Sequence, residues 1–95
     1  MGNAQLEAIE EIALQSGTYV VNDTNEFTAS TSIEGIYVAE DSVFTSIKVG
    51  GNDRMGQYIA DSTATIKAGV IIAPLRGFKF SGLQLTSGSV VAILT

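Results

Sequence analysis

The C-terminal third of the chain, residues 63–95, constrains the fold most, because it holds the densest apolar sequence in the protein. Its apolar and polar residues alternate, which is the period of a β-strand. Gly82 interrupts the alternation and shifts its phase by one residue, so we expect a β-bulge or a turn there. Residues 86–89 have the composition of a turn, and residues 90–94 are rich in β-branched side chains. The sequence therefore predicts a core hairpin within residues 80–92.

Short strands separated by turn-forming residues are expected along the rest of the chain. Residues 40–42 are predicted to form a turn between two of them. In the strand that follows, Val43 and Ile47 should share one face and Phe44 the other. Before the predicted hairpin, strands are expected at residues 18–21, 27–32, 36–39, 43–49, 57–60, 63–67 and 70–73.

This pattern predicts a mainly β protein. Turns that recur every eight to ten residues or so are typical of small all-β domains. Residues 18–95 are expected to form a single domain, a small antiparallel β-sandwich or barrel of about seven to nine short strands.

Residues 1–17 are predicted to form an amphipathic helix or arm ahead of the β domain. Asn3 can cap a helix over residues 3–15. A helix of this length is only marginally stable on its own, so it needs a surface to lie on. Two alternatives remain open: the segment caps an open end of the sheet, or it docks on another subunit. Its apolar stripe consists of Leu6, Ile9 and Ile12, and Glu7, Glu10 and Glu11 face away from this stripe.

The composition favours self-association. Apolar residues make up 45% of the chain and charged residues only 16%, against a usual charged fraction of about 25%. Residues 90–94 are apolar without alternation, so both faces of that strand must be covered, and we expect part of the cover to come from a neighbouring subunit. The residues predicted to form this interface are Leu6, Ile9, Ile12, Val70, Ile71, Ile72, Val91 and Ile93.

The charge distribution excludes two kinds of partner. The net charge is −5, and the five Lys and Arg residues are scattered along the sequence. Nucleic acids and anionic membranes both require clustered cations, so neither is an expected partner. No apolar run approaches the roughly 18–20 residues of a membrane span.

No catalytic, cofactor-binding or metal site is predicted. His and Cys are absent, and the adjacent acids Glu10-Glu11 and Glu40-Asp41 cannot converge as a catalytic carboxylate pair does. Residues 22–26 carry many oxygen donors but lack the spacing of an EF-hand, so an Asx-turn is expected there. The glycine-rich residues 50–56 lack the Gly-Lys-Ser/Thr of a phosphate-binding loop. The chain is therefore expected not to be an enzyme.

Three stretches, residues 40–47, 68–72 and 80–92, resemble small virion proteins of tailed bacteriophages. In such proteins an acidic turn leads into a strand, and a late stretch like FSGLQLTSGSVVA closes the sheet. The resemblance implies a structural protein of the virion, most of all a capsid decoration or cement subunit on the capsid surface. It implies a homo-oligomer, a trimer or a ring, that binds the major capsid protein or another virion protein.

A second hypothesis remains open beside this one. The chain would then be a tail, head–tail or fibre module that recognises a host-surface receptor or glycan. In that case residues 22–26 and 50–57 are the contact loops, and Tyr58 is an aromatic platform.

Overall fold

The computed structural model describes residues 17–94 of the chain. The predicted N-terminal helix and its interface residues Leu6, Ile9 and Ile12 lie outside the described residues. The elements are β1 (Thr18–Val21), β2 (Phe27–Val49), β3 (Asn52–Asp53), the 3-10 helix η1 (Met55–Gln57), β4 (Ile71–Ile72) and β5 (Phe80–Leu94).

The described chain is mainly β, as predicted. All strand pairs are antiparallel and belong to one five-stranded sheet of order β1-β5-β2-β3, in which β4 also pairs with β2. The only helical element within residues 17–94 is η1. No helix in this part of the chain is long and apolar enough to cross a membrane.

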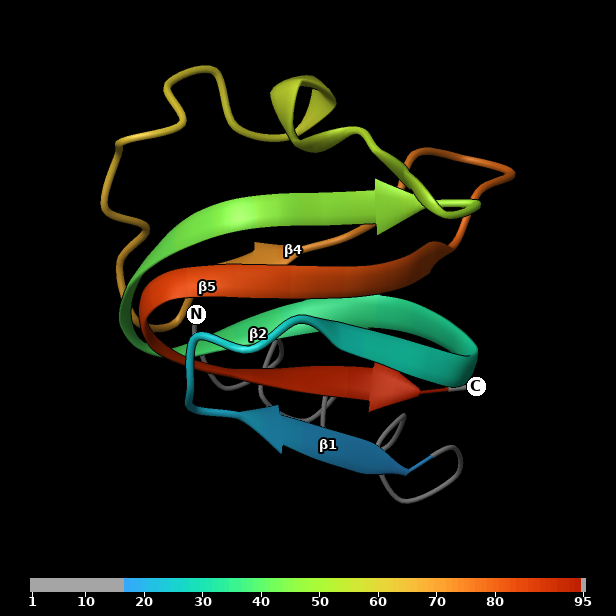
Figure 1. The fold of residues 1–95 in the computed structure, drawn as a ribbon, viewed down its shortest axis with the longest axis horizontal. Helices are drawn as coiled ribbons and strands as arrows, with labels where there is room; N and C mark the ends of the chain where they lie inside the picture. Colours follow the sequence, from blue (N-terminus) through green and yellow to red (C-terminus); the bar gives the residue numbers. More distant parts are fainter. Residues whose placement is uncertain (1–16, 95) are drawn as a thin grey trace.

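Two long strands, β2 and β5, form most of the sheet, and both bend sharply (Figure 1). Leu83, in the first half of β5, pairs with Ile47 on one side and with Phe27 on the other. Ala92, in the second half, pairs with Ile36 of β2 and with Tyr19 of β1. Each half of β5 therefore lies between two other strand segments, and the sheet curls around a common interior.

The predicted hairpin within residues 80–92 is therefore wrong. The two halves of β5 do not pair with each other, because each pairs with β2 instead. Residues 86–89 and 40–42, which were expected to be turns, lie inside continuous strands. The three strands expected over residues 27–49 are likewise segments of the single strand β2.

A β-bulge at the bend explains why turn-forming residues occur inside strands. The register passes from Glu40 opposite Ser89 to Val43 opposite Ser87, so two residues of β2 oppose Gly88 alone. Gly88 has a φ of 97°, which favours glycine. A bulge of this kind bends a strand while the ladder continues on both sides.

A second bulge confirms the irregularity expected beside Gly82. Lys48 pairs with Gly82 and Val49 with Phe80, which leaves Ser81 as an extra residue of β5. Gly82 also faces the start of β2 closely, because a Cβ on it would lie 2.5 Å from the carbonyl oxygen of Phe27.

Residues 54–79 contain less strand than the sequence predicts. The strand expected over residues 63–67 is wrong: it is reduced to one isolated bridge between Ser42 and Ile66. The strand expected over residues 57–60 is also wrong, since η1 and a turn occupy this place. The strand expected over residues 70–73 shortens to β4, because Pro74 carries no N–H for a ladder. In Figure 1 much of this segment passes over the end of the sheet formed by the last part of β2.

The core consists of the inward side chains of the curled sheet and of a few residues from the covering segment. Burial of these apolar side chains contributes roughly 1.5–3 kcal/mol for each large residue. The most deeply buried large side chains are Ile33, Ile36, Val38, Phe44, Ile47, Phe80, Leu83, Leu85 and Val90.

Candidate interaction surface

Exposed apolar side chains on the described chain form two candidate interaction surfaces. The first is a row of side chains across four neighbouring strands. Val91 of β5 is in register with Val20 of β1 and with Tyr37 of β2, and Tyr37 is in register with Ile71 of β4. Directly opposite residues of antiparallel strands point to the same face of a sheet. We call these four residues, Val20, Tyr37, Ile71 and Val91, the outer row.

The outer row faces away from the core. The residues that flank it along the strands, Val90 and Ala92 of β5 and Ile36 and Val38 of β2, are fully buried in the core. Alternation therefore directs the outer row to the opposite face. Val20 is 54% exposed, and Tyr37, Ile71 and Val91 are half-buried. These four side chains therefore form a candidate protein–protein contact on the outward face of the sheet.

The outer row brings together only some of the predicted interface residues. It includes Ile71 and Val91, and the neighbouring Val70 is 40% exposed. Ile72 and Ile93 are buried, so they are not available on the surface of the described chain. Tyr37 and Val20 were missed, because their place beside Val91 depends on pairings between strands far apart in the sequence.

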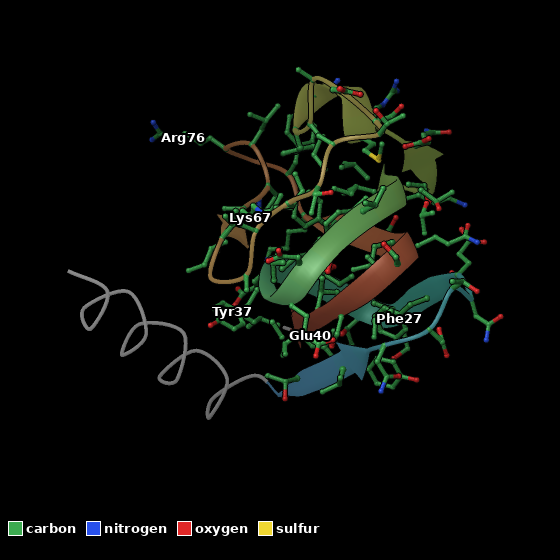
Figure 2. All side chains as sticks on the ribbon, turned by 90° about the vertical axis from the view of Figure 1, so that its left-hand side faces the viewer. Phe27, Tyr37, Glu40, Lys67 and Arg76 are labelled. Atoms are coloured by element: carbon green, nitrogen blue, oxygen red, sulfur yellow. The ribbon has the colours of Figure 1, made fainter. Side chains whose placement is uncertain are left out.

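The second surface surrounds a turn in the segment before β5. Phe78 N–H donates to the carbonyl oxygen of Leu75 at 2.9 Å, and Gly77 has the positive φ of 87° that this turn requires. Leu75 and Phe78 at the ends of the turn are 49% and 56% exposed. Figure 2 shows Arg76 directed away from the body of the protein.

Tyr58 holds this turn in place. Its hydroxyl accepts a hydrogen bond from Leu75 N–H at 3.0 Å, and its ring meets Phe80 edge-on with the centroids 5.0 Å apart. Val49, Arg54, Gln57, Tyr58 and Phe78 line a hollow of about 310 Å³ beside the turn. We call Arg54, Tyr58, Leu75, Arg76 and Phe78 the arginine surface.

Phe78, Lys79 and Phe80 alternate in polarity, as the residues of a strand do. The structure separates them, because β5 begins at Phe80, which is buried, while Phe78 belongs to the exposed turn. The turn-forming pair Arg76-Gly77 just before Phe78 was the available signal for this difference.

The chemistry-bearing residues of the described chain are engaged in local contacts. Asp23 accepts a hydrogen bond from Asn25 N–H at 3.1 Å, which confirms the Asx-turn in the oxygen-rich loop. Within residues 17–94, no group of three His, Cys, Asp or Glu side chains could hold a metal ion. Each lysine pairs with a carboxylate. The ion pairs are Lys48–Glu26, Lys67–Asp41 and Lys79–Glu34.

Two exposed carboxyl groups have a lowered pKa. The pKa of Asp41 is lowered chiefly by the hydrogen bond from Ala68 N–H, at 2.9 Å, and further by Lys67. The pKa of Asp61 is lowered by hydrogen bonds from the hydroxyl and the N–H of Thr63. Both carboxylates thus fix the backbone of the segment between η1 and β4.

Comparison with protein-family models, with curated proteins and with solved structures gave no match.

Proposed function

We propose that this chain is a non-enzymatic structural protein of a bacteriophage virion, a capsid decoration or cement subunit that oligomerises and stabilises the shell. The observation that carries the proposal is the outer row, an apolar strip on the outward face of a small β domain. The resemblance of residues 40–47, 68–72 and 80–92 to small virion proteins supports the same role. In this proposal the curled sheet is a small β-sandwich or barrel.

The outer row would bind the major capsid protein or another virion protein on the capsid surface. Its residues come from four strands held in register by backbone hydrogen bonds, so the strip needs little ordering when it binds. A preorganised apolar contact loses less conformational entropy on association than a loop does. Many copies bound across neighbouring capsid subunits would then raise the stability of the shell.

The test is binding of the purified full chain to empty capsids assembled from the major capsid protein of the same genome. We expect saturable co-sedimentation and a higher capsid melting temperature. Val20→Lys places a charge on the most exposed member of the outer row and should weaken binding at least about tenfold. Ser62→Lys adds the same charge in an exposed loop outside the outer row and should bind like the wild type. Absence of binding by the wild-type chain would overturn the proposal.

A second candidate function has an observation in its favour. The hollow beside the turn combines the aromatic rings of Tyr58 and Phe78 with the polar side chains of Arg54 and Gln57. Aromatic faces and hydrogen-bonding groups together are the chemistry that recognises sugars. A tail, head–tail or fibre module would bind a host-surface glycan or receptor there. A glycan array probed with the wild type and with Arg54→Ala tests this alternative. The wild type should bind a glycan, and Arg54→Ala should lose this binding.

A further inference from the structure

The hollow beside the turn is lined by hydrogen-bond donors and by no acidic side chain. Arg54, Gln57 and Tyr58 supply its polar groups, and Val49 and Phe78 supply its apolar wall. This lining contrasts with the whole chain, which has ten acidic residues and a net charge of −5. The hollow therefore fits a ligand that accepts hydrogen bonds and carries a negative charge.

The donors of the hollow have no partner among residues 17–94. Each of the three lysines in this range has a carboxylate partner, whereas the exposed guanidinium of Arg54 makes no ion pair and no side-chain hydrogen bond there. The side-chain amide of Gln57 makes no hydrogen bond within the same range either. The Tyr58 hydroxyl accepts from Leu75 N–H at 3.0 Å, which leaves its own proton available. Three neighbouring groups can therefore donate to one ligand.

The frame of the hollow is fixed by hydrogen bonds to the backbone. Arg54 N–H donates to the carbonyl oxygen of Ile47 at 2.8 Å, and Gln57 N–H donates to the carbonyl oxygen of Arg54 at 2.9 Å. Asp53, which precedes Arg54 in the sequence, accepts from Met55 N–H at 3.0 Å. The carboxylate of Asp53 thus helps to hold the frame. A ligand meets a backbone that is already ordered, so binding costs less conformational entropy.

The size and the walls of the hollow favour a sugar over other anions. Its volume of about 310 Å³ is at the lower end of the range for small-molecule sites. Phe78 is 56% exposed, and sugars place their apolar faces against such aromatic rings while their hydroxyls bind side-chain amides. An inorganic anion would pair with Arg54 but would leave the aromatic wall uncovered.

We propose that the hollow binds an anionic sugar, with the carboxylate or sulfate on Arg54 and the sugar ring against Tyr58 and Phe78. A guanidinium group binds such anions through two parallel hydrogen bonds. This inference rests on the second candidate function, glycan recognition, and names the ligand class of that site. It is compatible with capsid binding, because no residue of the outer row lines the hollow.

NMR titration of the full chain with four soluble probes tests the proposal. Methyl glucuronide carries a carboxylate, glucose 6-sulfate carries a sulfate, methyl glucoside is neutral, and acetate has the charge without the ring. We expect at least one charged sugar to bind at least about tenfold more tightly than both methyl glucoside and acetate. The amide signals that shift should be those of residues 54–58 and 78. The two charged sugars distinguish a carboxylate ligand from a sulfate ligand.

Three variants separate the charge of the site from its apolar wall. Arg54→Gln should remove the preference for the charged sugar, because it removes the cation of the hollow. Lys67→Gln removes a positive charge outside the hollow and should bind like the wild type. Phe78→Ala should weaken charged and neutral sugars by a similar factor. The shifted signals of the wild type locate the site independently of whether each variant folds.

Several outcomes would overturn the proposal: no binding of either charged sugar, acetate that binds as tightly as they do, or shifted signals only outside the hollow. Equal affinity for charged and neutral sugars would overturn the charge preference alone and leave glycan recognition standing. A charged sugar that binds the hollow, combined with a glycan array on which the chain binds nothing, would overturn recognition of a host-surface glycan and leave the anionic site standing.

Discussion

The hydroxyl of Ser42 occupies the space that a side chain on Gly88 would need. Ser42 Oγ donates to the carbonyl oxygen of Glu40 at 2.6 Å and accepts from Ser89 N–H at 3.0 Å. Ser42 is fully buried, and a Cβ on Gly88 would also lie 2.6 Å from the carbonyl oxygen of Asp41. This contact joins β2 and β5 at the point where both strands bend, so it fixes the bend that curls the sheet.

Gly88→Ala should therefore destabilise the protein by at least about 2 kcal/mol, through backbone strain and steric overlap together. Gly69→Ala is the matched control, because Gly69 has a similar φ of 94° but no atom lies within 4 Å of the place that a Cβ would take there. The free energy of unfolding of this control should fall by about 1 kcal/mol, because only backbone strain acts there. Urea unfolding of both variants measures the difference, and equal losses would contradict the steric part of the argument.

Ser42→Ala should cost about 1–3 kcal/mol, because it leaves the N–H of Ser89 without its acceptor in the interior of the bend. Ser46→Ala provides the contrast. The hydroxyl of Ser46 is buried without a hydrogen-bond partner in the described structure, so its removal should be neutral or stabilising. Chemical denaturation measures the free energy of unfolding of both variants. A larger decrease for Ser46→Ala than for Ser42→Ala would contradict this prediction.

Phe80→Ala and Phe78→Ala should differ strongly in stability although they lie two residues apart. Phe80 is fully buried, and its removal should cost about 3–5 kcal/mol. Phe78 is 56% exposed, and its removal should cost less than about 1 kcal/mol. A loss for Phe78→Ala as large as that for Phe80→Ala would contradict the exposed position of Phe78 in the turn of the arginine surface.

Asp41→Asn should change the pH dependence of stability. The folded-state pKa of Asp41 is lowered by Ala68 N–H and Lys67. A carboxyl group of this kind contributes stability above its unfolded pKa and loses it as the pH falls through its folded pKa. The variant should therefore melt below the wild type at neutral pH, and the gap should close below about pH 4. Thermal melts between neutral and acidic pH measure the gap, and a gap that does not change with pH would contradict this account.

The sequence by itself determined the fold class and much of the strand content. Residues 18–21 and the Asx-turn at Asp23 occur where they were expected, because alternation, β-branching and side-chain-to-backbone hydrogen bonds are local properties. The bulge beside Gly82 was also visible, as a shift in the phase of alternation.

The tertiary structure decided which of the apparent turns are bends and which side chains are exposed. Residues 40–42 and 86–89 have the composition of turns, yet the hydrogen bond between Ser42 and Ser89 keeps both inside long strands. The irregular pairing of Phe44 and Ser46 with β5 buries both Phe44 and Ile47, against the simple alternation that separates them. The bend depends on a contact between Ser42 and Ser89, which are 47 residues apart in the sequence, and no local pattern specifies that partner. For the same reason the outer row exists only in the folded sheet, where pairing places Val20, Tyr37, Ile71 and Val91 side by side.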